Sequence, residues 1–567
     1  MKWTRSICRG VKMTTQFNLD ERHIFPCYES FSGFIDGICA EHADKPALSW
    51  FTRKQEMFTY TYAELRERVI AFRAALCSLD IPNARIAIAA ENSAEWIVTF
   101  LAAATCSCTV ACIDVEQSDE RIREMIRDVQ ADILFVSSQY LPICSQLLQE
   151  QAVQHIAVFG GPAPDDNTIS WDSLFEQGRK LTLSGTVPEP AAKSDIAELI
   201  FTSGTDGKAK IVMLSESAIL KNVQGASNSV YLNTSVYSSL PFYHAYGLNI
   251  AVFCPLLEGA HLYINGDIRS ALRDLWLSGA ETMFAVPLIV KAVQSQIWQK
   301  LEADNNAELI DRLCKSGPAR KKFLRTIRKN QLSEIGKATV GNLKLIVSGG
   351  ASLDSDIAED FELLGVKVLQ GYGITECSPL IAVNCSYANK PGTVGLSLDS
   401  AEIRIENDEI WVKGPCVMLG YYNDPEQTAA AFEDGWFKTG DLGHFDKDGF
   451  LVLTGRKKNL IVFSNGKKIS PEMLERLIIK IPLVKEVVVY GSVSGTTSDD
   501  VKITASIFPD PEKSDGMASY ELLNRIQEDI EKINETLPAY QQIQMITLRE
   551  KEFPKTSIRK VMRQQLQ

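Results

Sequence analysis

One stretch of ten residues gathers side chains that are suited to binding phosphate. "FTSGTDGKAK" (201–210) contains two glycines, two threonines, a serine and two lysines, and it follows the apolar stretch "SDIAELI". Glycines let backbone N–H groups approach phosphate oxygens, hydroxyls add hydrogen-bond donors, and a lysine adds positive charge. The spacing of Gly204 and Gly207 does not fit a Walker loop. The stretch therefore predicts either a phosphate-binding loop of another kind or an ordinary Gly/Ser turn after a strand.

Five further stretches carry candidate functional side chains. One has a lone histidine between aromatic residues, one follows an expected strand, and one places a carboxylate in a tight turn. A fourth places an arginine where the composition changes, and the last is a basic loop. In chain order they are "LPFYHAYG" (240–247), "GYGITE" (371–376), "DGWFKTGDLG" (434–443), "LTGRKKNLI" (453–461) and "FPKTSIRKVMR" (553–563).

In this order the motifs resemble those of the adenylate-forming enzymes, which include acyl-CoA synthetases, stand-alone adenylation domains and luciferases. The resemblance covers almost the whole chain. Some long stretches are similar to bacterial long-chain fatty acyl-CoA ligases in particular, among them "VSGGASLDSDIAEDFELLGVKVLQGYGITECSPL" and "GRKKNLIVFSNGKKISPEMLE". Any one motif is weak, but five motifs in family order are specific.

The resemblance implies a two-step reaction. A carboxylate attacks the α-phosphate of Mg-ATP and gives an acyl-adenylate and pyrophosphate. A thiol, from CoA or from a phosphopantetheine carrier, then displaces AMP. The implied cofactors are therefore ATP, Mg²⁺ and CoA. The protein's part is to position the reactants and to stabilise charge.

The resemblance also implies a nucleotide site assembled from several motifs. The 201–210 loop would bind the β- and γ-phosphates, Tyr372 would stack on adenine, and Thr375 would contact the α-phosphate. Asp441 would accept hydrogen bonds from the ribose hydroxyls, and Arg456 would support ribose and phosphate. The residues implied to bind the nucleotide are Thr202, Ser203, Gly204, Thr205, Gly207, Lys210, Gly349, Gly350, Ala351, Gly371, Tyr372, Gly373, Thr375, Glu376, Asp441, Arg456 and Lys560.

Four of the matching residues carry catalytic roles in the family. Lys560 matches the lysine that bridges the carboxylate and the α-phosphate during adenylation. Glu376 and Thr205 match the Mg²⁺ ligands, and hard oxygen donors suit that ion. His244 matches an aromatic position that gates the acyl pocket. Lys560 belongs to a small mobile domain, which in the family closes for the first step and swings about a hinge, here Lys458, for the second.

Each of these residues also has a structural alternative. His244 could be a hydrogen-bonded histidine in a packed turn, and Glu376 could cap a helix. Asp441 could merely close the "TGDLG" turn, and Lys560 could be one more lysine of a basic tail. Their order along the chain favours the functional interpretation over these alternatives.

Three departures from the family pattern bear on activity. Asp206 stands where the family usually has threonine, and a carboxylate there would repel ATP phosphates unless it capped a helix or bound a cation. The usual Pro-Lys-Gly is replaced by Ala209, Lys210 and Ile211, and Arg559 replaces the glycine before Lys560. The loop therefore predicts altered nucleotide affinity, slow or specialised chemistry, or a degraded site.

Composition places the chain among ordinary globular proteins. Its 567 residues are 45% hydrophobic and 23% charged, with a net charge of −12, which argues against non-specific nucleic-acid binding. The 13 cysteines include no CxxC pair, and the basic N-terminus has no apolar core typical of a secretory signal. These features predict a cytoplasmic protein. The apolar context of Cys106, Cys108 and Cys112 favours buried thiols over a metal site.

The elements that position the motifs alternate between helix and strand. "TYAELRERVIAFRAALCSLD" begins with a capping box of Thr61 and Glu64, and strands and helices follow it in turn. The uncharged stretch 96–113 predicts a buried helix that leads into a buried strand, in preference to a membrane span. The basic stretch around 315–330 predicts a surface helix, with peripheral membrane contact as the alternative.

We expect an α/β fold with two domains. An adenylation domain (1–457) would contain two helix-packed sheets and a β-barrel-like subdomain, and a mobile α+β lid (458–567) would follow it. The main functional hypothesis is an AMP-forming acid–thiol ligase that activates a medium- or long-chain fatty acid and transfers it to CoA. The alternatives are an enzyme that loads an acyl or aminoacyl group onto a carrier protein in trans, and a binding protein with a degraded site.

Overall fold

The computed structural model describes most of the chain, and the description has several gaps. It covers residues 23–163, 168–186, 188–190, 195–202, 209–304, 306, 308, 329–463, 467–493, 501–555, 561 and 563. The chain forms two compact units. The first comprises Met1–Ile403, Val412–Phe437 and Lys447–Phe450, and the second comprises Arg404–Trp411, Lys438–Asp446 and Leu451–Gln567.

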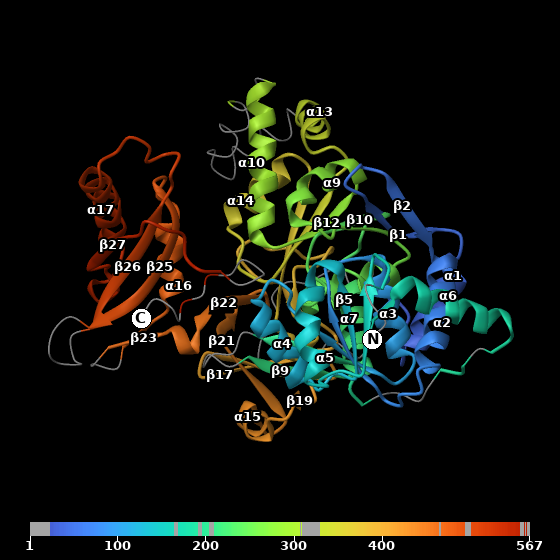
Figure 1. Cartoon of the computed structure of the whole chain (residues 1–567). Coiled ribbons are helices and arrows are strands. Elements are labelled where there is room, and N and C mark those ends of the chain that lie inside the picture. Colours follow the sequence, from blue (N-terminus) through green and yellow to red (C-terminus); the bar gives the residue numbers. More distant parts are fainter. Residues whose placement is uncertain are drawn as a thin grey trace. The chain divides into compact units, whose positions relative to one another are not determined.

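Two large sheets form the framework of the first unit (Figure 1). One has nine strands, in the order β16 (Leu396–Ser397), β15 (Leu380–Val383), β14 (Lys367–Gly373), β13 (Leu345–Ser348), β12 (Thr282–Ala285), β10 (Ser235–Ser238), β11 (His261–Ile264), β1 (Pro46–Phe51) and β2 (Met57–Thr61). The other has eight, in the order β19 (Gly420–Tyr421), β9 (Lys210–Leu214), β8 (Glu198–Thr202), β4 (Thr109–Cys112), β3 (Arg85–Ala89), β5 (Ile133–Ser137), β6 (His155–Phe159) and β7 (Thr168–Ser170).

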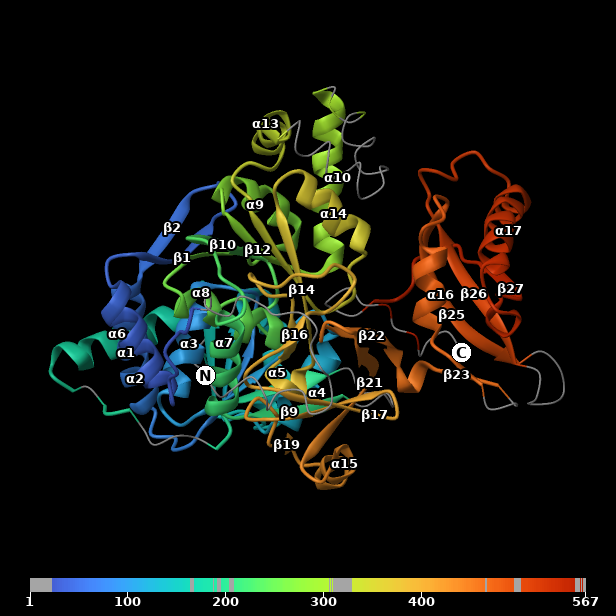
Figure 2. The same cartoon turned by 180° about the vertical axis from the view of Figure 1, so that it is seen from behind.

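Helices pack around both sheets, as Figure 2 shows from behind. They are α1 (Phe31–His42), α2 (Tyr62–Cys77), α3 (Ala94–Ala104), α4 (Asp119–Asp128), α5 (Cys144–Gln149), α6 (Trp171–Leu183), α7 (Glu216–Ser227), α8 (Phe253–Leu257), α9 (Ala271–Ser278), α10 (Pro287–Ala303), α13 (Lys329–Val340), α14 (Ser355–Leu363) and α15 (Pro425–Ala431). The central strands of both sheets are parallel, which is the arrangement expected from strand–helix alternation.

The predicted capping box begins α2. The Thr61 hydroxyl accepts a hydrogen bond from the Glu64 N–H at 3.2 Å, and the Glu64 carboxylate accepts one from the Thr61 N–H at 2.8 Å. The stripe of apolar residues that follows is buried, and α2 packs against α3 and α6. Local sequence therefore fixes both the start and the buried face of this helix.

The uncharged stretch 96–113 forms a buried helix and a buried strand, as predicted. It supplies most of α3 and all of β4, and nearly all its side chains are inaccessible to solvent. Among the helices in the described ranges, none has the length and apolar character needed to cross a membrane. Most of the basic stretch 315–330 lies outside the described residues.

A smaller sheet of five strands belongs mostly to the second unit. Its strands are β17 (Glu402–Glu406), β18 (Glu409–Lys413), β20 (Phe432–Glu433), β21 (Trp436–Phe445) and β22 (Leu451–Arg456), with β22 paired to β21. The expected fold class, several helix-packed sheets in a large N-terminal part and a smaller C-terminal part, is confirmed.

The C-terminal part of the second unit has the expected α+β character. Its elements are β23 (Ile461–Val462), β24 (Lys468–Ile469), α16 (Pro471–Ile478), β25 (Val484–Val493), β26 (Val501–Pro509), α17 (Ser519–Glu535) and β27 (Met545–Leu548). Leu522, Ile526 and Ile530 of α17 enter its core, as their helical spacing predicts. The sequence Ser470-Pro471 predicts a helix start with Ser470 as the N-cap. α16 does begin at Pro471, but the Ser470 hydroxyl donates to the Thr454 carbonyl at 2.7 Å and does not cap the helix.

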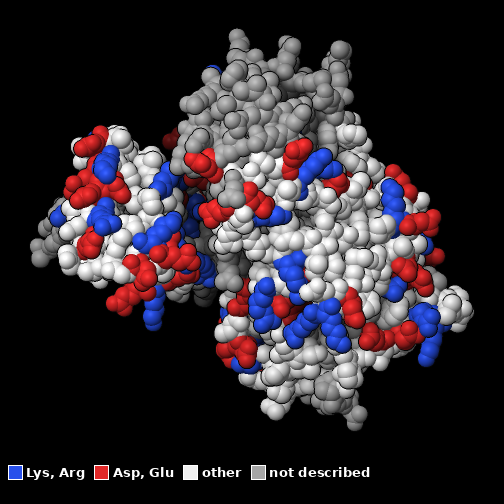
Figure 3. Space-filling model, turned by 90° about the horizontal axis from the view of Figure 1, so that it is seen from above, with Lys and Arg blue, Asp and Glu red and all other residues white. Residues whose placement is uncertain are grey.

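Charges of both signs are interspersed on the surface. Figure 3 shows lysines and arginines beside aspartates and glutamates over the described part of one face. Many form exposed pairs within one helix turn, such as Arg121 with Glu124 and Arg179 with Glu176. Exposed pairs of this kind contribute little to stability.

Candidate functional site

The phosphate-loop motif connects two antiparallel strands. Thr202 ends β8, Lys210 begins β9, and the two residues are directly paired across the hairpin. The Thr202 hydroxyl lies 3.4 Å from the Lys210 carbonyl oxygen, to which it donates. The loop between them (203–208) lies outside the described residues, and with it Ser203, Gly204, Thr205, Gly207 and the unusual Asp206.

The lysine that closes this hairpin lies in a row with a tyrosine and a glutamate. The Lys210 ammonium lies 4.6 Å from the centre of the Tyr421 ring and donates to Gln427 Oε1 at 3.1 Å. The Tyr421 hydroxyl donates to Glu376 Oε1 at 3.0 Å. Two predicted site residues far apart in the sequence, Lys210 and Glu376, are therefore connected through one aromatic ring.

Tyr421 remains a hydrogen-bond donor over the whole physiological pH range. Burial raises the pKa of its phenol well above the usual value, and the negative charge of Glu376 raises it further. The residue reaches this position because β19, of which it is part, pairs antiparallel with β9, where Tyr421 lies opposite Val212, two residues after Lys210. An uncharged donor satisfies one carboxylate oxygen and leaves the negative charge of Glu376 in place.

The structural alternative for Glu376, a helix cap, is not what the structure shows, because the N-cap of its turn is Ile374 and no side chain caps that turn. Thr375 and Glu376 lie in a single turn of 3₁₀ helix, 375–377, in which Glu376 is half-buried. The carbonyl oxygen of Glu376 accepts a hydrogen bond from the Met418 N–H at 2.8 Å. This hydrogen bond connects the turn to the segment that leads into Tyr421, and the Glu376 side chain points to the Tyr421 hydroxyl.

Glycines mark two close approaches near the carboxyl ends of β13 and β14. A Cβ atom on Gly349 would lie 3.0 Å from the ring of Tyr246, and Gly350 has φ of +82°, which favours glycine. Gly373 ends β14 so close to the Pro379 carbonyl that a Cβ atom would lie 2.2 Å from that oxygen. Because β13 and β14 are parallel neighbours, the predicted residues Gly349, Gly350 and Ala351 follow a strand adjacent to the one that carries Gly371, Tyr372 and Gly373.

Two further residues fix this region, and sequence analysis assigned neither of them a role. The side-chain amide of Gln370 exchanges two hydrogen bonds with the Leu353 backbone, at 3.2 and 3.1 Å. The Tyr246 hydroxyl donates to the Val347 carbonyl at 2.8 Å. Tyr372 itself is 6% exposed, and its stacking on adenine stays a prediction.

The segment around His244 follows β10 of the nine-stranded sheet and is fixed by Asn92, which lies in the loop after β3 of the eight-stranded sheet. Asn92 donates to the carbonyls of Leu240 and Asn265, at 2.8 and 3.0 Å, and accepts from the Phe242 N–H at 2.9 Å. His244 is half-buried beside Tyr243, with ring centres 4.9 Å apart. Burial lowers the pKa of His244, so the imidazole is mainly neutral at pH 7.

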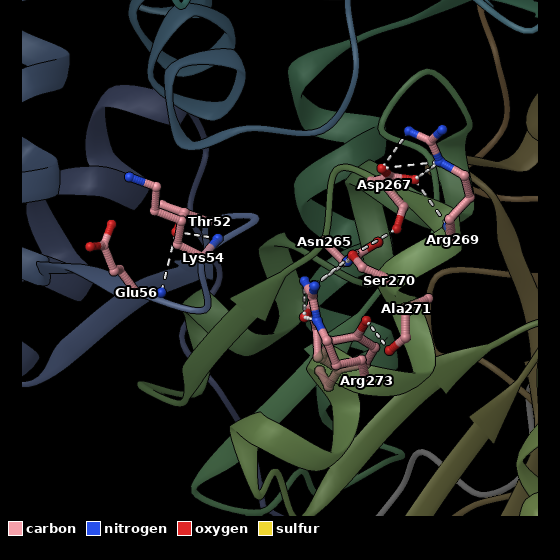
Figure 4. A network of polar contacts seen from close by, with 11 residues as sticks. Thr52, Lys54, Glu56, Asn265, Asp267, Arg269, Ser270, Ala271 and Arg273 are labelled. Carbon is pink, nitrogen blue, oxygen red and sulfur yellow. Dashed lines mark hydrogen bonds and ion pairs between the residues drawn. The ribbon is translucent and has the colours of Figure 1, made fainter.

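A polar network supports this segment from the start of α9 (Figure 4). Asn265 donates to Ser270 Oγ at 2.9 Å and to Asp274 Oδ2 at 2.7 Å. Arg273 forms an ion pair with Asp274 at 2.7 Å, and the Ser270 hydroxyl also donates to Asp274. The network fixes the turn after β11, whose Asn265 carbonyl accepts from Asn92.

In the second unit, Asp441 and Arg456 face each other across a strand pair. They are directly opposed on β21 and β22, and Arg456 Nε lies 2.6 Å from Asp441 Oδ1. Asp441 is 6% exposed, and its N–H donates to the Thr439 hydroxyl at 3.0 Å. The two residues that the resemblance assigns to ribose and phosphate therefore lie in contact in the folded chain.

The turn before Asp441 depends on a second ion pair. Gly440 has φ of +70°, and its N–H donates to Glu409 Oε1 at 3.0 Å. The other oxygen of Glu409 accepts from the Lys457 ammonium at 2.7 Å. The alternative role of Asp441, closing the "TGDLG" turn, is filled in part by Thr439 and Glu409.

Lys560 lies outside the described residues, but the chain on both sides of it is fixed. Lys555 and Val561 form an antiparallel bridge. Lys555 forms an ion pair with Glu486, and Arg563 forms one with Glu475. Residues 556–560 therefore connect two points that are bound to the C-terminal part of the second unit.

Glu198, at the start of β8, is a fully buried carboxyl group that sequence analysis missed. It accepts from Asn249 Nδ2 at 2.9 Å and from the Cys112 thiol at 3.5 Å. Burial raises its pKa to about 7, and these two hydrogen bonds lower it only in part. Such a contact needs the tertiary fold, because β4, β8 and the turn of π-helix that carries Asn249 are distant in sequence.

The described residues contain no cluster of three histidine, cysteine or carboxylate ligands that could bind a metal on its own. Cys108 and Cys112 are buried, as expected, whereas Cys106 is half-buried. A single carboxylate such as Glu376 still suits Mg²⁺, which in nucleotide enzymes takes one or two carboxylates and completes its shell with phosphates and water.

Comparison with known families identifies the class of the protein. The chain matches the AMP-binding enzyme family over residues 36–422 and the AMP-binding enzyme C-terminal domain over residues 458–567. The protein therefore belongs to the family of AMP-binding enzymes.

Named relatives and solved structures extend this result. The chain is 29% identical to the long-chain-fatty-acid–CoA ligase FadD15 of Mycobacterium bovis, over 80% of this chain and 78% of that one. It is 26% identical to the long-chain-fatty-acid–CoA ligase of Escherichia coli O6:H1, over 95% and 94%. Its fold is similar to that of the anthranilate CoA ligase AuaEII in complex with anthranoyl-AMP, with a TM-score of 0.76, 20% identity and coverage of 95% and 97%. It is also similar to a benzoate CoA ligase from Burkholderia xenovorans LB400, with a TM-score of 0.74, 20% identity and coverage of 95% and 100%.

Proposed function

We propose that the protein is an AMP-forming acyl-CoA synthetase that activates a medium- or long-chain fatty acid. The observation that carries the proposal is the row of Lys210, Tyr421 and Glu376, which brings the lysine of the phosphate-loop motif next to the carboxylate of "GYGITE". The long-chain-fatty-acid–CoA ligases among its relatives support the choice of substrate class.

In the first step, a carboxylate oxygen of the fatty acid forms a bond to the α-phosphorus of ATP, and the bond from that phosphorus to the bridging oxygen breaks. Pyrophosphate leaves, and the acyl group becomes attached to AMP. Thr202, Lys210 and the loop between them bind the leaving phosphates, and Thr375 and Lys560 contact the α-phosphate. Mg²⁺, bound by Glu376 and Thr205, would neutralise phosphate charge during this step.

Different groups bind the two parts of the nucleoside in this proposal. The backbone of residues 349–351 and 371–373 with Tyr372 receives adenine, and the Asp441 carboxylate accepts hydrogen bonds from the ribose. Arg456 supports Asp441 through the 2.6 Å ion pair and fixes the direction in which its oxygens point.

In the second step, the thiolate of CoA attacks the acyl carbonyl carbon. A carbon–sulfur bond forms, the bond from carbon to the AMP oxygen breaks, and AMP leaves. His244, neutral at pH 7, lies at the entrance of the acyl pocket in this proposal. A cytoplasmic enzyme would find both CoA and fatty acids available.

The test uses purified protein with Mg-ATP, CoA and carboxylic acids from acetate to oleate, together with anthranilate and benzoate. Mass spectrometry detects acyl-AMP and acyl-CoA. We expect acyl-CoA from a fatty acid, lost in Lys560→Ala and retained in the control Lys551→Ala, which changes an exposed lysine near the same tail. Acyl-AMP without acyl-CoA would contradict the choice of CoA and point to a carrier protein.

The Asp206 departure needs a separate variant. We expect Asp206→Thr to lower the KM for ATP by several fold, because removing a carboxylate next to phosphate removes repulsion. If the wild type forms no product from any acid and Asp206→Thr is active, the natural loop is disabled and the ligase proposal fails for this chain.

A further inference from the structure

Two cysteine thiols from different elements of the first unit lie in contact. Cys77 is the last residue of α2, and Cys106 lies in the turn between α3 and β4. Their sulfur atoms are 3.6 Å apart, although the residues are separated by 29 positions in the sequence. A disulfide requires sulfurs at about 2.05 Å, so the two thiols need to approach by roughly 1.5 Å.

The two thiols differ in access to solvent. Cys77 is exposed and Cys106 is half-buried, which leaves Cys77 as the sulfur that a dissolved oxidant reaches first. Cys106 is oriented by a long contact of 3.8 Å from its thiol to the Arg73 carbonyl. Most other described thiols are buried, and burial raises the pKa of Cys39 and Cys108 to about 12.

The electrostatic setting favours the thiolate of Cys77. The hydrogen bond from the Cys106 thiol and, to a smaller extent, the positive charge of Arg73 together lower the pKa of Cys77 to about 7, against the effect of burial. The same interaction raises the pKa of Cys106. A thiolate is the form that reacts with peroxides, so a substantial fraction of Cys77 is reactive at neutral pH.

We propose that Cys77 and Cys106 form a reversible disulfide when the protein meets a peroxide, with Cys77 as the attacking sulfur and Cys106 as the resolving one. This modification site is independent of the ligase reaction proposed above.

The chemistry balances with hydrogen peroxide as the oxidant. The Cys77 thiolate attacks one peroxide oxygen, the O–O bond breaks, and hydroxide leaves and is protonated to water. The sulfenic acid formed on Cys77 is then attacked by the Cys106 sulfur. A sulfur–sulfur bond forms, the S–O bond breaks, and the hydroxyl group leaves as water with the proton from Cys106. In total, two thiols lose two electrons and two protons, and one peroxide gives two waters.

Mass spectrometry tests the bond directly. The protein is treated with a small excess of hydrogen peroxide, alkylated without reduction and digested with trypsin. The expected product joins peptide 74–85 to peptide 86–121, is lighter than their sum by two hydrogen atoms, and disappears after reduction. Because the two peptides are adjacent, cleavage at Arg85 must be complete. Oxidation of Cys77 to a sulfinic acid with no cross-link would contradict the proposal.

Matched variants identify the partners. Cys77→Ser and Cys106→Ser should each abolish the cross-link. Cys27→Ser, which removes another exposed thiol, and Cys108→Ala, which removes the next thiol along the chain, should both retain it. Loss of the cross-link in Cys108→Ala but not in Cys106→Ser would show that Cys77 bonds to Cys108 instead of Cys106, and it would overturn the proposal.

A pH profile tests the interaction in the reduced protein. The rate at which iodoacetamide alkylates Cys77 should have its midpoint near pH 7 in the wild type. In Cys106→Ala the midpoint should move upwards by about one unit or more, towards the ordinary thiol value, because the hydrogen bond is gone. An unchanged midpoint would mean that Cys106 does not activate Cys77.

Discussion

Two buried or half-buried carboxyl groups in each unit differ in the charge of their partners. In the first unit, Glu376 accepts from the phenol of Tyr421, and Glu198 accepts from the amide of Asn249 and a thiol. In the second unit, Asp441 forms an ion pair with Arg456, and Glu409 forms one with Lys457. Neutral donors orient a carboxyl group without neutralising it, whereas cations also compensate its charge.

This difference matches the proposed roles. Glu376 must present negative charge to Mg²⁺, and a phenol orients it for that purpose without competing for the charge. Asp441 must offer hydrogen-bond acceptors to uncharged ribose hydroxyls, and the ion pair with Arg456 fixes the direction in which its oxygens point. Several pairs in the first unit do not follow the pattern, since Lys344 pairs with Glu281, Lys390 pairs with Asp448, and Arg273 pairs with Asp274 in the network of Figure 4. That network is structural in this account.

The largest effect is expected from Glu376→Gln. Glutamine keeps the size of the side chain but removes the charge, so acyl-AMP formation should fall about 10²- to 10³-fold. Pyrophosphate exchange at several Mg²⁺ concentrations measures the loss. Glu426→Gln, at an exposed glutamate on α15, is the control and should retain full activity. A Glu376→Gln enzyme with wild-type exchange would remove Glu376 from the metal site.

The next effect concerns Glu198 and the pH dependence of stability. The folded-state pKa of Glu198 is about 7, above the ordinary value of 4.5. Its favourable contribution to the free energy of unfolding is therefore complete below about pH 4.5 and is lost as the pH rises through 7. Glu198→Gln removes this pH-dependent loss of unfolding free energy, which amounts to up to about 3 kcal/mol.

Urea unfolding of the first unit at pH 5 and pH 8 checks this prediction. The free energy of unfolding of Glu198→Gln, relative to wild type, should rise between the two pH values. The exposed Asp128→Asn should show no such change. Equal differences at both pH values would mean that Glu198 is ionised in the folded protein across this range.

A smaller effect is expected from Asp441→Asn. The variant should lose about 2 kcal/mol of ATP binding, roughly a 30-fold rise in KM, because charge-assisted hydrogen bonds to the ribose are weakened. The penalty should be smaller with 2′-deoxy-ATP, which lacks one of the two hydroxyls. An equal rise in KM for ATP and for 2′-deoxy-ATP would show that Asp441 acts only through the Arg456 ion pair.

The smallest effect is expected from Tyr421→Phe. It removes one hydrogen bond to Glu376, which is worth about 1 kcal/mol or roughly fivefold in kcat/KM for ATP. The neighbouring Tyr422→Phe is a matched control and should leave kcat/KM unchanged. Equal effects of the two variants would break the proposed link from Lys210 through Tyr421 to Glu376.

Local signals in the sequence predicted much of the fold. The capping box of α2, the buried helix and strand of 96–113, and the spacing of apolar residues in α17 each depend on neighbours a few positions away, and the structure confirms them. Glu376, Asp441 and Arg456 were selected from the order of motifs. Their proposed roles still await the experiments above.

The supporting residues could not be predicted in this way. Tyr421 reaches Glu376 because β19 pairs with β9. Asn92 reaches the His244 segment from the loop that follows β3 of the eight-stranded sheet. The Asp441–Arg456 contact depends on strand register, and a bulge follows directly at Leu442. Such contacts follow from tertiary packing, for which a single sequence offers no local signal.

The central claim is that the acid is activated through an acyl-adenylate, and an isotope experiment tests it most directly. The protein is incubated with a fatty acid labelled with ¹⁸O in both carboxylate oxygens, together with Mg-ATP and CoA. We predict that one ¹⁸O atom per turnover appears in AMP, since the carboxylate oxygen bonds to the α-phosphorus and remains there when CoA displaces the nucleotide. Label in inorganic phosphate, with ADP as the nucleotide product, would show that the γ-phosphate is attacked instead and would contradict the account.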